Sequence, residues 1–217
     1  MPNWCDNRLV VTGPAKDLER FVLRGIRPAT PDEEEDGFDA PDPGVVSYLS
    51  MEKFIPVPRP KPPLTPEQIG SLPKEEQFQH WSKRLAGIFS GEFFREENFD
   101  RYTWCEEHWG TKWDIHAQLD EYEPGAAYYR FDSAWSPPNK FIAAVARIYP
   151  SLCFQLDYIE LGVGFRGRST ARGAEFNDAS WNITEDDLID MGYEDLVNTT
   201  EEDEVWWRVS PDASANR

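Results

Sequence analysis

The chain has 217 residues, 40% of them hydrophobic, and 40 Asp and Glu against 22 Lys and Arg give it a formal net charge of -18. This length fits one domain with insertions, and nine Trp, eight Tyr and thirteen Phe supply enough apolar area for a core. The charge argues against nucleic acid as a direct ligand, because phosphate would be repelled, and no apolar run approaches the ~20 residues that cross a bilayer.

Two stretches hold the whole excess of negative charge. Residues 32–42 contain seven acids and residues 178–204 contain eleven, and neither stretch contains Lys or Arg. The rest of the chain is neutral, because its 22 acids balance 22 bases. A neutral body with two acidic segments predicts a surface that presents charge to a basic protein or a cation. The alternative is that both segments are solvated loops, since runs of like charge are often tails.

The first half of the chain predicts a strand and a helix followed by a long insertion. Residues 8–12 have the pattern of a short strand. The apolar residues of the next segment fall on one face of a helix: Leu18, Phe21, Val22 and Ile26. Six prolines within residues 55–66 then favour an extended conformation and exclude a central strand. We expect helices at about residues 74–89 and 104–109.

The second half predicts more regular structure. In order, we expect strands at residues 114–120 and 127–135, a helix after Ser136, a strand at 154–161 and a hairpin of 165–168 with 171–176. In the first of these strands apolar and polar residues alternate, as in a half-buried strand. The second strand is expected to turn Tyr129, Phe131 and Trp135 to one face.

The order of these elements is strand, helix, insertion, strand, strand, helix, strand. It predicts an α+β fold, a ferredoxin-like βαββαβ sandwich with an antiparallel sheet, an extra C-terminal hairpin and a helical, proline-rich insertion after the first helix. The domain organisation that follows is a core of residues 1–27 and 109–177, an insertion of residues 28–108 and an acidic C-terminal extension of residues 178–217. Residues 185–191 have helical character, and Val205–Trp207 are predicted to dock the extension.

Several motifs carry a family resemblance. The opening Met-Pro-Asn-Trp-Cys-Asp-Asn-Arg-Leu, the Trp-Gly-Thr-Lys-Trp-Asp of residues 109–114 and the Phe-Asp-Ser-Ala-Trp-Ser-Pro-Pro of residues 131–138 resemble the YubB-type ferredoxin-like proteins of phages and conjugative plasmids. Residues 158–162 and 165–167 extend the match, although Leu161 and Arg166 stand where the family pattern has Glu and Ala. The resemblance implies the ferredoxin-like fold and a mobile-element origin, but it implies no reaction.

Motifs for chemistry are weak. The run from Gly162 to Gly167 fits GxGxxG, but no helix follows it, so a hairpin is the expected structure. Arg166, Arg168 and Arg172 beside these glycines could hold an anion. Cys105 and His108 have ligand spacing, but a structural zinc site draws on two such pairs. We therefore predict no catalytic residue, metal or cofactor.

The first functional hypothesis is a non-enzymatic interaction protein of a phage or plasmid. It would bind a basic host protein in the bacterial cytoplasm, where the three scattered cysteines would stay reduced. Occupation of a nucleic-acid groove would make it a DNA-mimicking counter-defence inhibitor. The predicted partner-binding residues are Asp32, Glu33, Glu34, Glu35, Asp36, Glu185, Asp186, Asp187, Glu201, Glu202, Asp203 and Glu204.

Two alternatives stay open. A small molecule or nucleotide would occupy an aromatic pocket of Trp109, Lys112, Trp113, Asp114, Asp132 and Trp135. An enzyme would use carboxylates among Asp114, Asp132 and Glu160. Bulky aromatics at strand ends also fit a core, and carboxylates on adjacent strands also fit salt bridges. The sequence leaves the oligomeric state open.

Overall fold

The computed structural model describes residues 3–28, 46–58, 66–79, 82 and 100–197. The chain divides into two compact units. The first comprises Met1–Pro56 with Cys105–Arg217, and the second comprises Val57–Trp104. The first unit thus includes part of the predicted insertion and the C-terminal extension as well as the predicted core.

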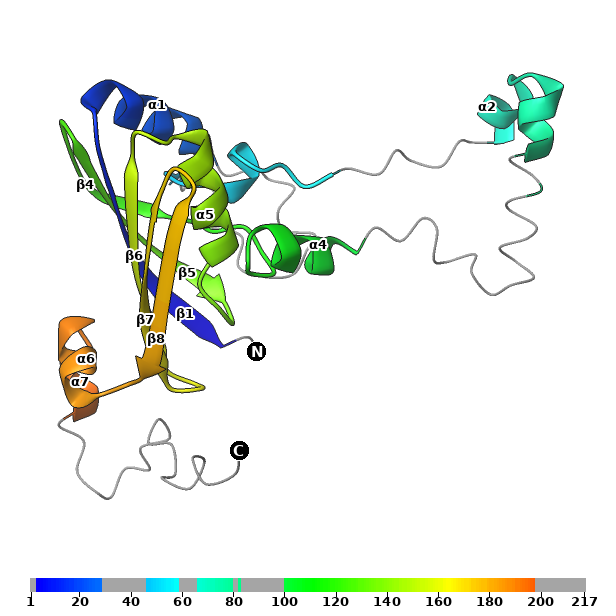
Figure 1. The fold of residues 1–217 in the computed structure, drawn as a ribbon. Helices are drawn as coiled ribbons and strands as arrows, with labels where there is room; N and C mark the ends of the chain where they lie inside the picture. The colour runs from blue at the N-terminus through cyan, green and yellow to red at the C-terminus, as the bar shows by residue number, and fades with distance from the viewer. Residues whose placement is uncertain (1–2, 29–45, 59–65, 80–81, 83–99, 198–217) are drawn as a thin grey trace. The chain divides into compact units, whose positions relative to one another are not determined.

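The first unit is built on a six-stranded antiparallel sheet in the order β4-β5-β1-β6-β7-β8 (Figure 1). The strands are β1 Trp4–Thr12, β4 Gln118–Glu123, β5 Ala126–Ala134, β6 Cys153–Glu160, β7 Phe165–Arg172 and β8 Glu175–Asn182. Helices α1 (Ala15–Gly25) and α5 (Asn139–Ile148) complete the order β1-α1-β4-β5-α5-β6. The predicted ferredoxin-like βαββαβ arrangement is confirmed, and β7 with β8 forms the extra hairpin.

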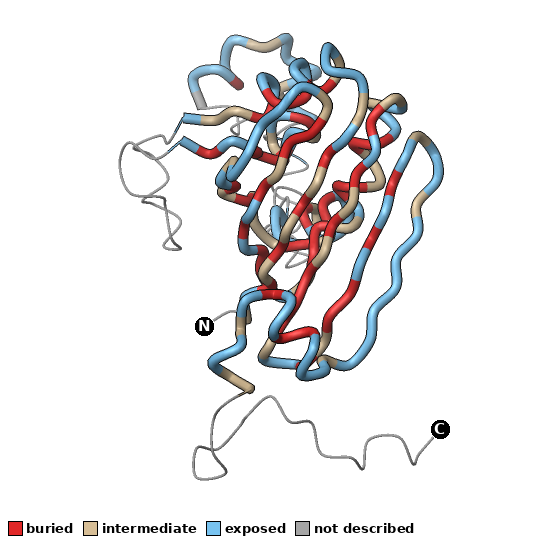
Figure 2. Tube along the Cα trace, turned by 90° about the vertical axis from the view of Figure 1, so that its left-hand side faces the viewer, coloured by how far each residue is buried: buried red, intermediate tan, exposed pale blue. Residues whose placement is uncertain are grey.

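One face of the sheet is covered by helices α1 and α5. Alternate residues of β1, from Cys5 to Val11, are buried beneath them, as the period of two requires. Phe21 of α1 lies at the centre of an aromatic cluster, with ring centroids 5.1–6.2 Å from those of Phe54, Tyr129, Tyr149 and Phe154. The edge strands β4 and β8 are mostly exposed (Figure 2).

Strand β4 begins at Gln118, four residues later than predicted. The alternation that suggested an earlier start is real, since Ile115 and Ala117 are each 1% exposed. Their partners, however, lie in the predicted insertion: Tyr48 N donates to Ala117 O at 2.9 Å, and Ala117 N donates to Ser47 Oγ at 3.2 Å. The predicted insertion also contains the short strand β3 (Val46–Ser47) and the 3-10 helix η2 (Met51–Lys53), and β3 pairs with the short strand β2 (Arg27–Pro28) at the boundary with the predicted core.

The C-terminal hairpin differs from the prediction. Residues 165–172 form one unbroken strand, and the turn lies at Gly173, whose φ of +58° favours glycine. Strand β8 then runs to Asn182, so the first residues of the predicted acidic extension belong to the sheet. Gly167 has a separate role, because a Cβ there would lie 2.2 Å from Tyr158 Oη.

Trp135 does not share the buried face of Tyr129 and Phe131, so that expectation is wrong. Strand β5 ends at Ala134, and Trp135 is 45% exposed with a φ of +69°. The backbone N–H of Trp135 donates to the backbone carbonyl of Asn3 at 2.9 Å. This tertiary bond holds the residue in a conformation that a bulky L residue rarely adopts.

Three predicted helices are present where they are described: residues 74–79 are helical, α4 (Arg101–His108) begins three residues before the predicted 104–109, and α6 (Glu185–Asp190) lies within the predicted 185–191. The structure adds the short helices α2 (Pro66–Gly70) and α7 (Glu194–Val197). The rest of the helix predicted at residues 74–89, apart from Ser82, and the docking segment Val205–Trp207 lie outside the described residues. Across the described part of the chain, every helix is too short or too polar to span a membrane.

Candidate partner-binding surface

Helices α6 and α7 pack against the sheet face opposite to α1 and α5. Ile159 of β6 forms a small apolar cluster there with Leu188 and Met191 of the α6 segment, and all three are at most 2% exposed. Partly buried side chains pack around it: Leu161, Ile183, Tyr193, Leu196 and Val197. The first part of the acidic extension is therefore an ordered element of the domain.

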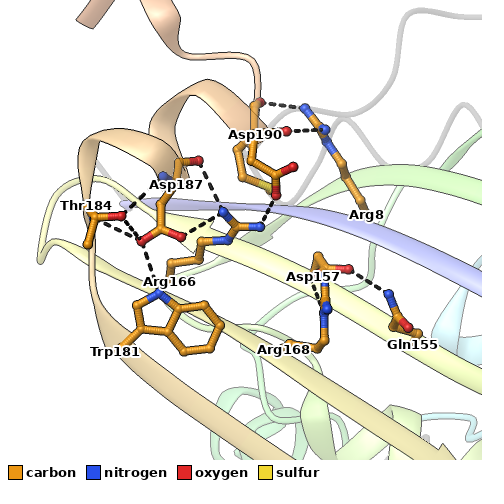
Figure 3. Close-up of polar contacts among 10 residues, drawn as sticks. Arg8, Gln155, Asp157, Arg166, Arg168, Trp181, Thr184, Asp187 and Asp190 are labelled. Carbon is orange, nitrogen blue, oxygen red and sulfur yellow. Dashed lines mark hydrogen bonds and ion pairs between the residues drawn. The ribbon is translucent and has the colours of Figure 1, made fainter. Parts of the chain in front are cut away.

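Arg166 anchors α6 from strand β7. Its guanidinium Nη1 lies 2.8 Å from Asp187 Oδ1, and its Nη2 donates to Asp190 Oδ2 (Figure 3). The Arg166 side chain is only 6% exposed, so this pair is shielded from solvent. Nearby, Arg168 Nε lies 2.6 Å from Asp157 Oδ1. The sequence suggested that the arginines beside the glycine-rich turn could hold an anion. Arg166 and Arg168 instead bind carboxylates of this chain, those of Asp187 and Asp157.

Asp187 also closes the first turn of α6. Its Oδ2 accepts from Thr184 N at 2.9 Å, Thr184 Oγ1 at 2.7 Å and Trp181 Nε1 at 3.0 Å, and Asp187 N donates to Thr184 Oγ1 (Figure 3). This is a reciprocal capping box. Burial alone would raise the pKa of Asp187, but the bonds from Thr184 and Trp181 and the charge of Arg166 outweigh it, so the pKa is lowered.

The structure corrects the prediction that Asp187 contacts a partner. The residue is 8% exposed, and both of its carboxylate oxygens already accept hydrogen bonds within the chain. The sequence reasoning also missed the residues that hold it, Arg166, Trp181 and Thr184. The Thr184-x-x-Asp187 spacing was the available signal, because it is the spacing of a capping box.

The far end of the α6 segment is held by strand β1. Arg8 Nη1 donates to Asp190 O at 3.0 Å, and its Nη2 donates to Met191 O. A cation at these carbonyls complements the negative end of a helix. Tyr193 Oη donates to Asp6 Oδ2 at 3.1 Å, which ties the link between α6 and α7 to the same strand.

The outer side of α6 and α7 carries acids. Glu185, Asp186 and Asp195 are exposed, and the Asp190 side chain is 65% exposed. We call these four residues the acidic surface. The sequence has no Lys or Arg between Arg172 and Arg208, and in the described part of the chain the bases that bond to these acids are Arg166, which pairs with Asp190, and Arg8, which binds the Asp190 carbonyl. Glu185 and Asp186, two of the predicted partner-binding residues, are thus exposed at fixed positions.

The other predicted partner-binding acids lie outside the described residues. They are Asp32, Glu33, Glu34, Glu35, Asp36, Glu201, Glu202, Asp203 and Glu204. Their role stays a prediction from the sequence.

Two of the predicted pocket residues are parts of the core. Trp109 is fully buried, and its Nε1 donates to Ile55 O at 3.0 Å. The Asp114 carboxylate accepts from Met51 N at 2.6 Å and Ser50 Oγ at 2.5 Å, and it lies 3.0 Å from Arg27 Nη1. Burial outweighs these contacts and raises the pKa of Asp114. Both residues hold the 50–55 segment in place, so the prediction that they line a ligand pocket is wrong.

Three other pocket residues lie in an exposed aromatic cluster. The Trp113 ring centroid is 6.1 Å from that of Trp4, and Lys112 Nζ is 5.8 Å from that of Trp135. Trp4 and Trp135 are 41% and 45% exposed. The remaining residue, Asp132, lies opposite Asp6 on the neighbouring strand. The six predicted pocket residues are therefore divided between the core, this cluster and the sheet.

The carboxylates considered for catalysis have separate environments. Glu160 is 1% exposed and accepts from Gly162 N and Val163 N, so it closes the turn after β6. Partial burial, and secondly the charge of Asp6, raise the pKa of Asp132. Asp114 bonds to the 50–51 segment instead. Nor does the described part of the chain hold any group of three His, Cys, Asp or Glu side chains that could bind a metal.

A family model agrees with this architecture. Residues 108–205 match the family described as "Ferredoxin-like domain in Api92-like protein". The crystal structure of a protein api92 from Yersinia pseudotuberculosis aligns with 85% of this chain and 99% of its own, at 11% identity and a TM-score of 0.43. No curated protein matches the chain. The chain therefore contains a ferredoxin-like domain similar to that of Api92-like proteins.

Proposed function

We propose that this chain is a non-enzymatic interaction protein whose acidic surface binds a basic protein. The observation that carries the proposal is the buried Arg166–Asp187 pair, which fixes α6 on the sheet while Glu185 and Asp186 stay exposed. Binding by an ordered surface loses less conformational entropy than binding by a tail. The fixed acids therefore favour a binding site over a solvated run.

The family resemblance extends this proposal. A phage or plasmid origin would place the partner in the cytoplasm of a bacterial host. A groove that normally accepts phosphates would be attracted to the exposed carboxylates of the acidic surface. On this reading the chain inhibits a nucleic-acid-binding defence factor by imitating DNA.

Affinity capture with matched variants tests the proposal. The full chain, a Glu185→Gln/Asp186→Asn/Asp195→Asn variant and a Glu19→Gln/Glu107→Gln/Glu123→Gln control would each be exposed to host lysate. The two variants lose the same charge from exposed positions. We expect one basic protein on the wild type and the control, released by salt because exposed charges are screened, and absent from the first variant. Equal capture by all three would refute the proposal.

A second candidate function rests on the exposed aromatic cluster. The half-exposed Trp4 and Trp135 rings, with Lys112 over Trp135, offer stacking and a positive charge to a small molecule or a nucleotide. Tryptophan fluorescence against a metabolite library would test it. A ligand of this cluster should be lost in Trp135→Ala and kept in the acidic-surface variant, and the opposite pattern would exclude this candidate.

A further inference from the structure

Strand β8 presents an open sheet edge. Among the described residues it pairs only with β7, in a register that runs without a shift from Arg172–Glu175 to Phe165–Asn182. Seven of its eight residues are exposed. An edge of this length offers an unpaired row of backbone donors and acceptors to another strand.

The turn decides which backbone groups face outward. The turn between β7 and β8 has two residues, so the residues on either side of it, Arg172 and Glu175, exchange backbone hydrogen bonds with each other. Such hydrogen-bonded pairs recur at every second position, and the β8 residues between them point their N–H and C=O groups away from β7. The bond from Ile183 N to Gly164 O, at 3.2 Å, fits this alternation at the other end of the hairpin. The residues that turn N–H and C=O to the open edge are therefore Phe176, Asp178, Ser180 and Asn182.

The two edges of the sheet are protected differently. On the opposite side, β4 has a register shift between Leu119 and Glu121 and carries Asp120, Glu121 and Glu123. Such irregular pairing discourages the addition of a strand. Strand β8 has a regular register and contains no proline or lysine. The β8 edge is thus the one suited to accept a strand.

Charge identifies the occupant. Glu175 and Asp178 lie on β8 itself, and Glu185 and Asp186 begin the helix that follows it. Pairing with the β8 of a second copy would bring these acids together, and like charges on paired strands are destabilising. An extended segment rich in Lys and Arg would instead meet opposite charge along the edge and at the start of α6.

We propose that β8 accepts an extended basic segment of a partner protein as a seventh strand. The inference rests on the proposed function and deepens it, because it gives the binding mode by which the basic partner is held. Backbone hydrogen bonds along β8 would supply affinity and register, and the flanking acids would select for positive charge.

The test uses a defined probe and the full chain. The probe is a fluorescein-labelled octapeptide of alternating Lys and Val, and its control is the same sequence with alternating D and L residues, which has equal charge but does not adopt the twisted, pleated strand of an all-L peptide. In Ser180→Pro, the lost N–H faces the open edge, so the β7–β8 ladder stays intact while the edge is blocked. Ser180→Ala keeps the N–H and is the matched control.

We expect fluorescence anisotropy to show at least tenfold weaker binding of the all-L probe to Ser180→Pro than to Ser180→Ala, and at least tenfold weaker binding of the D,L peptide to the wild type. Should Ser180→Pro not fold, hydrogen exchange of the wild type decides: the probe should slow the amides of Phe176, Asp178, Ser180 and Asn182, and leave Asn177 and Ala179 unchanged. The inference is overturned by equal affinities, by no binding at millimolar probe, or by self-association through β8.

The two proposals fail in distinguishable ways. If the probe binds the Glu185→Gln/Asp186→Asn/Asp195→Asn variant more weakly but binds Ser180→Pro as well as the wild type, the proposed role of the acidic surface stands and the proposal of an added strand is overturned. Weaker binding to Ser180→Pro alone would support the edge and contradict the role of the acids. Undiminished binding to both variants would overturn both proposals.

Discussion

The two faces of the sheet are held by different kinds of interaction. Against α1 and α5 lies an apolar interior in which Phe21, Phe141 and Phe154 are at most 1% exposed. Against α6 and α7 the fully buried apolar cluster has only three members, with five partly buried side chains around it. The ion pairs of Arg166 and the hydrogen bonds of Arg8, Trp181 and Tyr193 add to these contacts. Burial of apolar area holds the first face, whereas a smaller apolar cluster together with ion pairs and hydrogen bonds holds the second.

This difference has a functional consequence. Each buried Phe or Leu side chain contributes about 1.5–3 kcal/mol, so the helix-covered face stabilises the whole fold. The opposite face depends on the buried Arg166–Asp187 ion pair. Removal of one partner of such a pair is strongly destabilising, because it leaves the other charge buried without compensation. A few substitutions should therefore release α6 and α7 without unfolding the sheet.

Phe21→Ala should have the largest effect. Phe21 is fully buried among four aromatic rings, and truncation of a buried Phe costs about 3–5 kcal/mol through lost burial and the cavity left behind. Urea denaturation followed by circular dichroism would measure the loss. Leu23→Ala on the same helix is the control, since Leu23 is 63% exposed and should change the free energy of unfolding by less than about 0.5 kcal/mol. Similar losses in both would disprove the apolar account of this face.

Arg166→Met should release α6 and α7 while the core stays folded. It leaves the Asp187 carboxylate buried without its cation, at a cost of about 3 kcal/mol, which corresponds to roughly 100-fold more open molecules. Native proteolysis by a Glu-specific protease would report this as faster cleavage after Glu185 and Glu194.

Arg168→Met is the matched control for Arg166→Met. Arg168 pairs with Asp157, but its side chain is 51% exposed, so its loss should cost less than about 1 kcal/mol. Cleavage rates that rise equally in the two variants would argue against a special role for Arg166.

Acid should weaken the α6 contact selectively. The pKa of Asp187 is lowered on folding, so its contribution is fully present above the ordinary value of 3.8 and is lost as the pH falls through the lower folded pKa. In NMR spectra recorded from pH 7 to pH 2, the methyl signals of Leu188 and Met191 should change below about pH 4, because the folded pKa lies below the ordinary value. The same titration in Asp187→Asn should lack this transition, and its persistence would assign the change to another group.

Asp132→Asn should have the smallest effect of these changes, and unlike them it should raise the free energy of unfolding. Asp132 lies directly opposite Asp6, and partial burial together with that charge raises the pKa of Asp132. Because Asp132 is exposed to screening by solvent, removal of its charge should stabilise the fold by only about 0.5 kcal/mol or less at pH 7. The gain should vanish at pH 3, where the wild-type carboxyl is protonated. A gain that is independent of pH would exclude repulsion as its cause.

The sequence predicted correctly those helices and strands whose apolar residues recur with a clear helical or strand period. The apolar stripe of α1 and the alternation in β5 gave correct elements, and their order gave the ferredoxin-like fold. The start of β4 was missed because Ala117 bonds to Ser47 and Tyr48, a contact across about 70 residues that no local period encodes. Trp135 was misplaced because its left-handed conformation depends on a bond to Asn3.

The candidate site was predicted in part. The net charge located acids that are exposed on α6, Glu185 and Asp186, but it could not separate them from Asp187. That separation depends on Arg166, which lies 21 residues earlier and faces α6 only because β7 pairs within the sheet. Residue type gives charge, whereas burial and pairing decide which charges stay available to a partner.

Hydrogen exchange of the wild-type full chain at neutral pH tests the central claim most directly, namely that α6 is an ordered acidic surface docked on the sheet. The amides of Leu188 and Met191, which donate to Thr184 O and Asp187 O, should exchange at least about 100-fold more slowly than in an unstructured peptide. Exchange of both amides at the unstructured rate, while the amides of β1 stay protected, would contradict the account and return the C-terminal acids to the status of a solvated tail.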